Sequence, residues 1–469
     1  MNKLVKSIRE AVALSGLKDG MTVSFHHHLR NGDFVLNMVM EEIAALGLKD
    51  LTVNASSLFD VHAPLLTHIK NGVVTGISAD YIAAGLGRAF SEGVMNKPVE
   101  FRTHGGRPRD IALGRTPIDV AFIAAPTADP MGNCSGKYGK SACGSLGYAY
   151  ADAMYAKKVV VITDNLVPYP MQDWSISENY IDYVVCVDAI GDPKGIVSGT
   201  TQITRDPVGL VMASHAAKVI ETSGLLKDGF SFQTGAGGAS LAAAKFLKET
   251  MLKKQIQGSF GLGGITGYMV DMLQAGCFRN LMDVQCFDLK AVESIKNDPR
   301  HQEISALQYA APGARGAVVD NLDVVILGAT EVDTNFNVNV HTDSNGYIMG
   351  GSGGHSDTAA GAKLTMIIAP LFRARLPIVT DRVTCISTPG ENIDVLVTQG
   401  GIAVNPKNVE LKQRLVEAGL PITDIEALKQ KAERITGAPQ KPKHGERVVA
   451  HVIGREGDLQ DSIYCVGNR

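Results

Sequence analysis

The chain has 469 residues, of which 45% are apolar and 20% are charged, and its formal net charge is −3. This length exceeds what one hydrophobic core accommodates and predicts two domains. No apolar run is long enough to cross a bilayer, and the small net charge gives no electrostatic reason to expect nucleic acid or a membrane surface as a partner.

The N-terminal segment, residues 1–16, places its apolar side chains at the spacing of one face of an amphipathic helix. It lacks the compact apolar stretch and the small-residue cleavage site of a signal peptide, so we expect a cytoplasmic protein. The seven cysteines agree with this expectation, because their odd number and the absence of a CxxC pair indicate neither a disulfide framework nor a zinc site.

A run of three histidines follows the first expected strand and precedes an expected helix at residues 33–47. Neighbouring side chains on a strand point to opposite faces, and no cysteine or carboxylate follows at ligand spacing, so we predict no metal site. His26, His28 and Arg30 instead offer several N–H donors to a ligand rich in carboxylates, whose burial requires such partners. The alternative is one buried histidine with two neighbours at the surface.

A second basic loop spans residues 101–109. The planar fork of Arg107 suits a carboxylate, and Gly105 and Gly106 let the backbone approach a ligand closely. We therefore expect His104, Gly105, Gly106 and Arg107 to contact an anionic substrate. Solvated surface arginines are the alternative.

Three more glycine clusters, at residues 235–238, 261–264 and 350–354, follow expected strands. Clustered glycines expose backbone N–H groups to a ligand, although glycines after strands also serve tight turns. Two strand-end turns, at residues 129–133 and 331–335, carry carboxylates. Acid-base work is one interpretation of these carboxylates, and we favour local hydrogen bonds within the turns.

The sequence repeats itself once. Residues 15–25 (SGLKDGMTVSF) are echoed by residues 223–233 (SGLLKDGFSFQ). In the same order, residues 116–135 parallel residues 320–339. An internal duplication of one α/β unit follows from these matches.

Short β-branched runs alternate with helical segments in both halves, which predicts mostly parallel sheets flanked by helices. We expect two tandem α/β domains, at residues 1–215 and 216–469, the second ending in a polar appendage from about residue 406. Ligands bind beyond the carboxyl ends of strands in such sheets, so the cleft between the domains is the expected site. No GxSxG elbow or Walker loop occurs, and the scattered glycines make no convincing dinucleotide fingerprint, which weakens hydrolase, nucleotidase and dehydrogenase interpretations.

Four long segments, residues 24–33, 101–133, 232–247 and 258–277, resemble the citrate lyase alpha chain, a member of the wider CoA-transferase group. The resemblance runs through nearly the whole chain. It implies two tandem, internally duplicated CoA-transferase-like domains, in agreement with the repeat found above.

In the wider CoA transferases, a glutamate shortly before a segment like residues 266–276 attacks the acyl thioester. In this chain that position falls at about Gly263. A glycine cannot form an acyl-enzyme, so the resemblance implies direct exchange in a ternary complex. A citrate carboxylate would attack the acetyl thioester to give a mixed anhydride, and the released thiolate would attack the citryl carbonyl to give citryl thioester and acetate.

We assign three groups of candidate site residues to this reaction. The expected oxyanion donors are Gly263, Gly264, Gly353 and Gly354. The expected contacts to the CoA-derived arm of the carrier are Gly235, Gly237, Gly238, Gly261 and Gly351. The expected citrate contacts are His26, His28, Arg30, His104, Gly105, Gly106 and Arg107.

The resemblance also implies the partners: a gamma acyl-carrier subunit, whose CoA-derived prosthetic group is a cosubstrate, and a beta lyase subunit, in an oligomer. It implies no metal and no covalently bound cofactor on this chain. Three rival functions stay open at this point. They are a CoA transferase or hydrolase that uses free acyl-CoA with a small monocarboxylate, a non-catalytic scaffold, and a sugar-phosphate isomerase-like enzyme.

Overall fold

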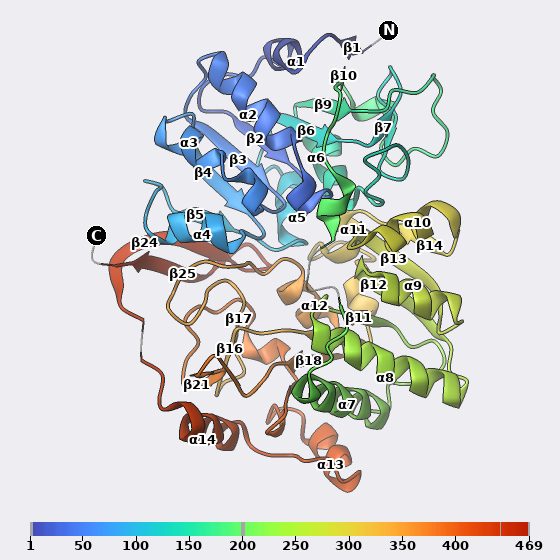
Figure 1. The fold of residues 1–469 in the computed structure, drawn as a ribbon, viewed down its shortest axis with the longest axis vertical. Coiled ribbons are helices and arrows are strands. Elements are labelled where there is room, and N and C mark those ends of the chain that lie inside the picture. Colours follow the sequence, from blue (N-terminus) through green and yellow to red (C-terminus); the bar gives the residue numbers. More distant parts are fainter. Residues whose placement is uncertain (1–2, 198–201, 441, 468–469) are drawn as a thin grey trace.

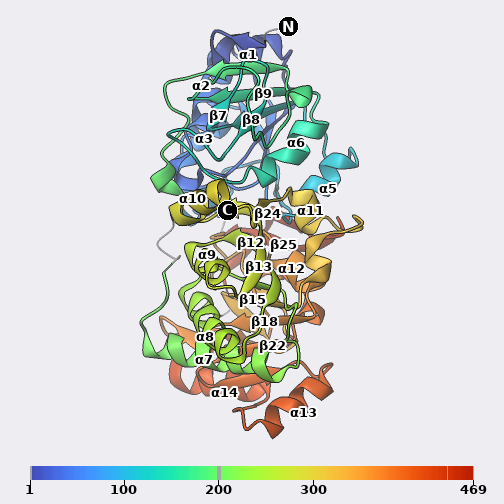
Figure 2. The same cartoon turned by 90° about the vertical axis from the view of Figure 1, so that its right-hand side faces the viewer.

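The computed structural model describes residues 3–197, 202–440 and 442–467, which form two lobes stacked along the long axis (Figures 1 and 2). The first lobe is built on a 10-stranded sheet. In spatial order, its strands are β1 (Leu4–Val5), β10 (Tyr183–Cys186), β9 (Lys158–Thr163), β6 (Val120–Ala124), β2 (Thr22–Phe25), β3 (Leu51–Ala55), β4 (Val74–Ala79), β5 (Val99–Phe101), β24 (His444–Ile453) and β25 (Leu459–Val466). Its helices are α1 (Ile8–Leu14), α2 (Val35–Ala45), α3 (Leu65–Lys70), α4 (Ala84–Ser91), α5 (Gly106–Ala112) and α6 (Tyr150–Tyr155).

The second lobe is built on an 8-stranded sheet. In spatial order, its strands are β14 (His301–Glu303), β13 (Phe278–Cys286), β12 (Gly258–Ile265), β11 (Phe232–Thr234), β15 (Val324–Leu327), β18 (Leu364–Ile368), β22 (Val395–Thr398) and β23 (Gly401–Val404). Its helices are α7 (Pro207–Thr222), α8 (Gly238–Lys254), α9 (Gly267–Gln274), α10 (Leu289–Asn297), α11 (Ala306–Ala310), α12 (His355–Gly361), α13 (Val409–Glu417) and α14 (Ile425–Thr436).

Short strands form small sheets outside the two main sheets. Antiparallel pairs join β7 (Thr127–Ala128) to β8 (Cys134–Ser135) and β19 (Phe372–Arg373) to β20 (Leu376–Pro377). A small sheet contains β17 (Val338–Asn339), β16 (Glu331–Asp333) and β21 (Val379–Thr380). No helix in the described ranges is long and apolar enough to span a membrane.

The central strands are continuous apolar runs because helices cover both faces of each sheet. Five of the six residues of β9 are buried, and all four residues of β15 are buried. Within each sheet the strands at the centre pair in parallel, as in β9 with β6 and β15 with β18. Apolar burial of this kind stabilises parallel sheets, and the α/β class predicted from the sequence is confirmed.

The sheet topology repeats between the lobes. Strand β2 lies between β6 and β3, and β11 lies in the same way between β15 and β12. The outer neighbours also correspond, because β9 and β10 extend one sheet in the order that β18 and β22 extend the other. The duplication that the repeated segments predict is therefore present in the fold.

The C-terminal hairpin is in the first lobe. Strand β24 pairs in parallel with β5, with Ala450 opposite Val99, and β25 pairs with β24 in the antiparallel sense. The pattern of residues 447–454 predicts the strand but gives no partner, and we expected it in the second domain. Helix α7 begins at Pro207 and packs along α8, so the second lobe begins before the expected boundary at residue 216.

Candidate active site between the lobes

The loops that follow the central strands of both sheets meet where the lobes touch. Several hydrogen bonds cross this junction. Among them, His104 N donates to Gly353 O at 2.9 Å, Gly353 N to Asp80 O at 3.1 Å, and Gln285 Nε2 to His27 O at 2.9 Å. We call the residues gathered here the interlobe site. Its members are Arg30, His27, Asp80, His104, Tyr148, Gln233, Gly263, Gly264, Phe287, Tyr309, Gly353 and Gly354.

The histidine run leaves β2 and places His27 at the centre of an aromatic group. The His27 ring centroid lies 4.7 Å from that of Tyr148 and 5.6 Å from that of His104. His27 Nδ1 lies 2.6 Å from Ser56 Oγ, and His28 Nε2 accepts a hydrogen bond of 3.3 Å from Tyr148 N. Burial lowers the pKa of both His27 and His28 well below the ordinary value, so both rings are neutral.

Arg30 carries the unpaired cation of the interlobe site. Its guanidinium carbon lies 5.3 Å from the centroid of the Phe59 ring and 5.0 Å from that of Phe287. Its Nη1 atom is buried and has no hydrogen-bond partner in the described part of the chain. Burial lowers the pKa of Arg30 because no carboxylate offsets the desolvation. The φ of 51° puts Arg30 in the left-handed region, which is costly for a side chain of this size and is found most often at functional sites.

Arg107 has a different role from the one expected. Its Nη1 and Nη2 atoms donate to the two carboxylate oxygens of Asp152 at 2.9 and 2.8 Å, and its Nε donates to Asn54 Oδ1 at 2.6 Å. The residue is only 1% exposed. Its donors are thus engaged inside the first lobe, and the structure does not place Arg107 against a ligand.

His26 lies with Arg107 behind the interlobe site. Its Nδ1 is 3.9 Å from Asp152 Oδ2, and neither ring nitrogen makes a hydrogen bond within the described ranges. Burial lowers the pKa of His26 to about 4, so the ring is neutral at physiological pH. His26 therefore lies away from the junction, contrary to the expected citrate contact, whereas Arg30 lies at the junction.

His104 follows β5 and is held by the carboxylate of Asp80. His104 Nδ1 lies 2.9 Å from Asp80 Oδ2, and the His104 ring centroid lies 4.4 Å from that of Tyr148. A Cβ on Gly353 would lie 3.2 Å from His104 Nε2. The absence of a side chain at Gly353, whose φ is 51°, therefore leaves space beside the ring.

Gly105 and Gly106 connect the lobes structurally. Gly105 N donates to Asp357 Oδ2 at 2.8 Å, and Gly106 N donates to Thr103 Oγ1 at 2.8 Å. Thr103 Oγ1 in turn donates to Asp357 Oδ1 at 2.9 Å. These backbone donors are occupied, so the two glycines hold α5 against the second lobe in place of the substrate contact that we expected.

Gly263, where the resemblance leads us to expect the absent glutamate, lies in the interlobe site. A β-bulge separates Gly263 from Gly264 in β12, and the φ of Gly263 is 105°. A Cβ on Gly263 would lie 2.8 Å from the side chain of Gln233, and a Cβ on Gly264 would overlap the ring of Phe287. Gln233 and Phe287 therefore fill the space that side chains would need at these two glycines.

Gln233 and Tyr309 form a hydrogen-bonded pair beside Gly354. Gln233 Nε2 donates to the Tyr309 hydroxyl at 3.0 Å, and a Cβ on Gly354 would lie 2.5 Å from that hydroxyl oxygen. Burial raises the pKa of Tyr309, so the hydroxyl stays protonated and can donate. Gly263, Gly353 and Gly354, expected separately as oxyanion donors, are thus brought together around this pair and His104.

The other expected glycines serve the packing of the chain. A Cβ on Gly261 would lie 2.6 Å from Met269 Cε, and a Cβ on Gly351 would overlap the carbonyl of Asp80. The glycines of the turn from β11 into α8 are Gly235, Gly237 and Gly238. Gly235 N donates to Ile326 O at 2.9 Å, and Gly237 is the N-cap of α8. Contact of these glycines with a carrier arm remains a prediction.

The strand-end carboxylates make local hydrogen bonds, as we favoured. Asp129 Oδ1 accepts from Met131 N and Gly132 N, both at 2.9 Å. Asp333 Oδ1 accepts from Asn335 N at 2.9 Å and from Asn337 N at 3.0 Å. Both turns are therefore structural.

Several members of the interlobe site carry no sequence signal of their own. His27 is hidden in the histidine run, and Gln233 lies in one of the segments that carry the family resemblance. Tyr148 and Tyr309 are single aromatic residues in loops or short helices, and no motif spacing marks them. Asp80 is recognisable only as an aspartate after a strand. Three-dimensional contact alone identifies these residues.

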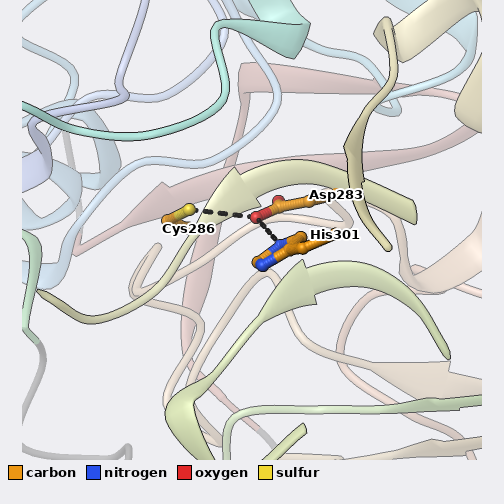
Figure 3. A group of neighbouring side chains, drawn as sticks. All are labelled: Asp283, Cys286 and His301. Atoms are coloured by element: carbon orange, nitrogen blue, oxygen red, sulfur yellow. Dashed lines mark hydrogen bonds and ion pairs between the residues drawn. The ribbon is translucent and has the colours of Figure 1, made fainter. Parts of the chain in front are cut away.

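A buried group with metal-ligand chemistry lies at the end of β13 (Figure 3). Cys286 Sγ donates to Asp283 Oδ2 at 3.0 Å, and His301 Nε2 lies 3.0 Å from the same oxygen. Asp283 Oδ1 is buried and has no hydrogen-bond partner in the described chain. Burial raises the pKa of Cys286 well above its ordinary value, so the thiol stays protonated and the three side chains form a hydrogen-bonded network.

Comparisons with known proteins identify the family of the chain. The family described as citrate lyase, alpha subunit (CitF) matches residues 1–466. The citrate lyase alpha chain of Haemophilus influenzae is 50% identical over 464 residues, which cover 99% of this chain and 93% of that one. A crystal structure of the citrate lyase alpha subunit from Streptococcus mutans in complex with citrate has a TM-score of 0.98 at 50% identity, and covers 100% of this chain and 92% of that chain.

A more distant structure shares the fold alone. The alpha subunit of a malonate decarboxylase from Acinetobacter baumannii has a TM-score of 0.69 at 16% identity, over 93% of each chain. The two chains share their fold, and this chain has the two related α/β units that the sequence predicts. The length and the identity of the match to the alpha subunits show that this chain belongs to the citrate lyase alpha chain family.

Proposed function

We propose that this chain transfers the thiol of an acyl carrier from acetyl to citrate, converting acetyl thioester and citrate into citryl thioester and acetate. The observation that carries the proposal is the unpaired Arg30 guanidinium at the junction of the lobes. A buried cation without a carboxylate partner is costly, and an anionic substrate relieves that cost. The relative from Streptococcus mutans was crystallised with citrate.

Direct exchange fits the site better than a covalent acyl-enzyme. Gly263 stands where a nucleophilic glutamate would be, and Gln233 fills the space beside it. The two carboxylates that flank the site are engaged, Asp80 by His104 and Asp357 by Thr103 and Gly105. We therefore propose that the citrate carboxylate itself attacks the acetyl carbon.

In the first step, a citrate carboxylate oxygen bonds to the acetyl carbon, and the sulfur leaves with the bonding pair. In the second step, the thiolate attacks the citryl carbonyl of the mixed anhydride, and acetate leaves. No general base is needed because both nucleophiles are already ionised. Holding two reactants in attack geometry contributes about 7 to 11 kcal/mol, and each well-placed donor to an oxyanion contributes about 3 kcal/mol. The Tyr309 hydroxyl and the backbone N–H of Gly354 are the candidate donors, whereas the N–H of Gly353 is already bound to Asp80 O.

The partners follow from the family. We propose that the chain works in the cytoplasm within a citrate lyase oligomer. A gamma subunit would supply the thiol on a CoA-derived prosthetic group, which is a cosubstrate and not a cofactor of this chain. A beta subunit would cleave citryl thioester. The proposed transfer uses neither a metal nor a covalently bound cofactor on this chain.

The test uses the purified chain with acetyl-CoA as the donor. We expect citrate-dependent release of acetate together with citryl-CoA, and an unchanged intact mass after quenching during turnover. Acetate release with succinate or butyrate but not citrate would instead support a CoA transferase or hydrolase acting with a monocarboxylate. An acyl adduct, which peptide mapping would assign to Asp80 or another residue, would overturn direct exchange. Absence of turnover with both acetyl-CoA and the acetylated carrier would indicate a scaffold.

A further inference from the structure

His104 is the ring of the interlobe site with one nitrogen bound and one nitrogen free. Nδ1 is bound to Asp80, and no residue in the described ranges contacts Nε2 through a hydrogen bond. The backbone fixes the same group, because His104 N donates to Gly353 O and Gly353 N donates to Asp80 O. The His104 side chain is 12% exposed, whereas that of Asp80 is 1% exposed. The free nitrogen is therefore held in place and is reachable.

The charge balance of this pair differs from that of Arg30. Arg30 is a permanent cation without a carboxylate partner and suits an anion that is present before the reaction, such as citrate. His104 lies beside the Asp80 carboxylate, so a positive charge on the ring has a negative partner when no ligand is bound. A balanced pair suits an anion that exists only transiently, because it adds no large cost to the resting enzyme.

His104 lies close to the residues that we expect at the acyl group. A Cβ on Gly353 would be 3.2 Å from Nε2, so the missing side chain leaves room for a ligand there. The adjoining Gly354 borders the Tyr309 hydroxyl, and Tyr309 bonds Gln233, which borders Gly263. The free nitrogen of His104, the Tyr309 hydroxyl and Gly263 are thus linked by adjacent contacts.

We propose that His104 Nε2 faces the thioester sulfur and stabilises the thiolate released from the acetyl group, and that Asp80 positions the ring for this role. The inference rests on the proposed transfer reaction. In the first step the C–S bond breaks as the citrate oxygen bonds to the acetyl carbon, and the sulfur carries the electron pair. The Nε2–H of His104 donates to that sulfur, and Nδ1 keeps its hydrogen bond with Asp80. In the second step the sulfur bonds to the citryl carbon, so the proton stays on His104 and the exchange releases none.

The test separates a role at sulfur from a role in citrate binding. In His104→Gln we expect kcat to fall by about 100-fold, which is the usual effect of losing one donor that stabilises developing negative charge in an acyl-transfer site. The citrate Kd, measured by calorimetry, should be unchanged. In Asp80→Asn, which keeps the shape of the side chain but removes its charge, we expect a smaller fall in kcat and again an unchanged citrate Kd. His215→Gln, on α7 in the second lobe, is the matched control and should leave both quantities unchanged.

Circular dichroism and thermal unfolding must show that each variant is folded. A full kcat in His104→Gln would overturn the proposal, and so would a weakened citrate Kd whose effect on rate disappears at saturating citrate. Failure of the wild-type chain to form citryl-CoA would overturn the transfer reaction itself. That outcome is distinguishable, because it is seen before any variant is made.

Discussion

Arg107 of the first lobe is buried and has a carboxylate partner, whereas Arg30 is partly buried and has none within the described residues. In the sequence they are equally basic residues in glycine-containing or histidine-containing loops, and we expected both to hold citrate. The difference arises because Asp152, which lies far from Arg107 in the sequence, folds against it. A pairing of this kind follows from tertiary packing and has no local pattern.

Arg30→Ala should therefore weaken citrate binding more than it affects acetyl-CoA. We expect the citrate Kd to rise by about 10-fold to 100-fold, because a charged hydrogen bond contributes roughly 1.5 to 3 kcal/mol. Isothermal titration of citrate and of acetyl-CoA measures both affinities. Arg88→Ala, on the exposed face of α4, is the control and should change neither. An equal loss of affinity for the two ligands would contradict the assignment of Arg30.

Arg107→Ala should act on stability. Removing one partner of a buried ion pair leaves Asp152 without compensation, and such changes cost about 3 to 5 kcal/mol. Urea unfolding of Arg107→Ala should show this loss in the free energy of unfolding, while Arg88→Ala should lose less than about 1 kcal/mol. A stable Arg107→Ala variant with weakened citrate binding would restore the original expectation.

His355 predicts a pH dependence of stability. Its Nε2 lies 2.9 Å from Gly328 O and its Nδ1 lies 2.7 Å from Thr388 Oγ1, and burial lowers its pKa to about 4. The unfolded chain takes up a proton near the ordinary value of about 6.5, before the folded chain does. Stability is therefore lost as the pH falls from about 6.5 to about 4, by about 3 kcal/mol for this residue.

Asp357 acts in the opposite direction over nearly the same range, because burial raises its pKa to about 6 and stability is lost as the pH rises toward that value. Comparison of variants separates the two residues. We expect the change in the free energy of unfolding between pH 7 and pH 4 to differ between the two proteins. On lowering the pH, the wild type should lose about 3 kcal/mol more stability than His355→Gln. Parallel pH profiles for the two proteins would show that His355 does not titrate in this way.

At the scale of elements, strand β12 carries Gly263, the position at which we expect a covalent mechanism to need a glutamate. The bulge at Gly263 turns the backbone to a φ of 105°, and Gln233 packs against the bare Cα. The family resemblance alone points to this position in the sequence, because it aligns Gly263 with a glutamate expected in the wider CoA transferases. The bulge and the Gln233 contact depend on the pairing of β11, β12 and β13, and no feature of the glycine cluster reveals them.

Gly263→Ala should disturb the site locally. The added Cβ meets Gln233, and the positive φ disfavours a side chain, so we expect a loss of stability of about 1 to 3 kcal/mol and a fall in kcat. Gly276→Ala is a matched control, since it also has a positive φ, 80°, but its Cβ would meet no atom within 4 Å. Urea unfolding and the transfer assay should show that only Gly263→Ala loses activity. Equal activity in both variants would mean that the bulge does not shape the site.

At the scale of the whole molecule, the repeat and the strand-helix alternation were enough to predict two related α/β units with mostly parallel sheets. The repeated segments lie on β2 and β11 and on β6 and β15, the central strands of each sheet. The lobe boundary was less predictable, because α7 is compatible with either half until its packing along α8 is known. The destination of residues 444–466 was not predictable, because an amphipathic strand does not specify its partner.

The return of the chain to its starting lobe has a consequence for synthesis. Residues 207–436 form a unit inserted between β10 and β24, so the lobe made first on the ribosome is completed last. Until β24 emerges, β5 presents an unpaired edge, which is a template for association with other nascent chains. The inserted lobe can fold in the meantime. The hairpin of β24 and β25 then pairs with β5 and completes the first sheet as the last step of folding.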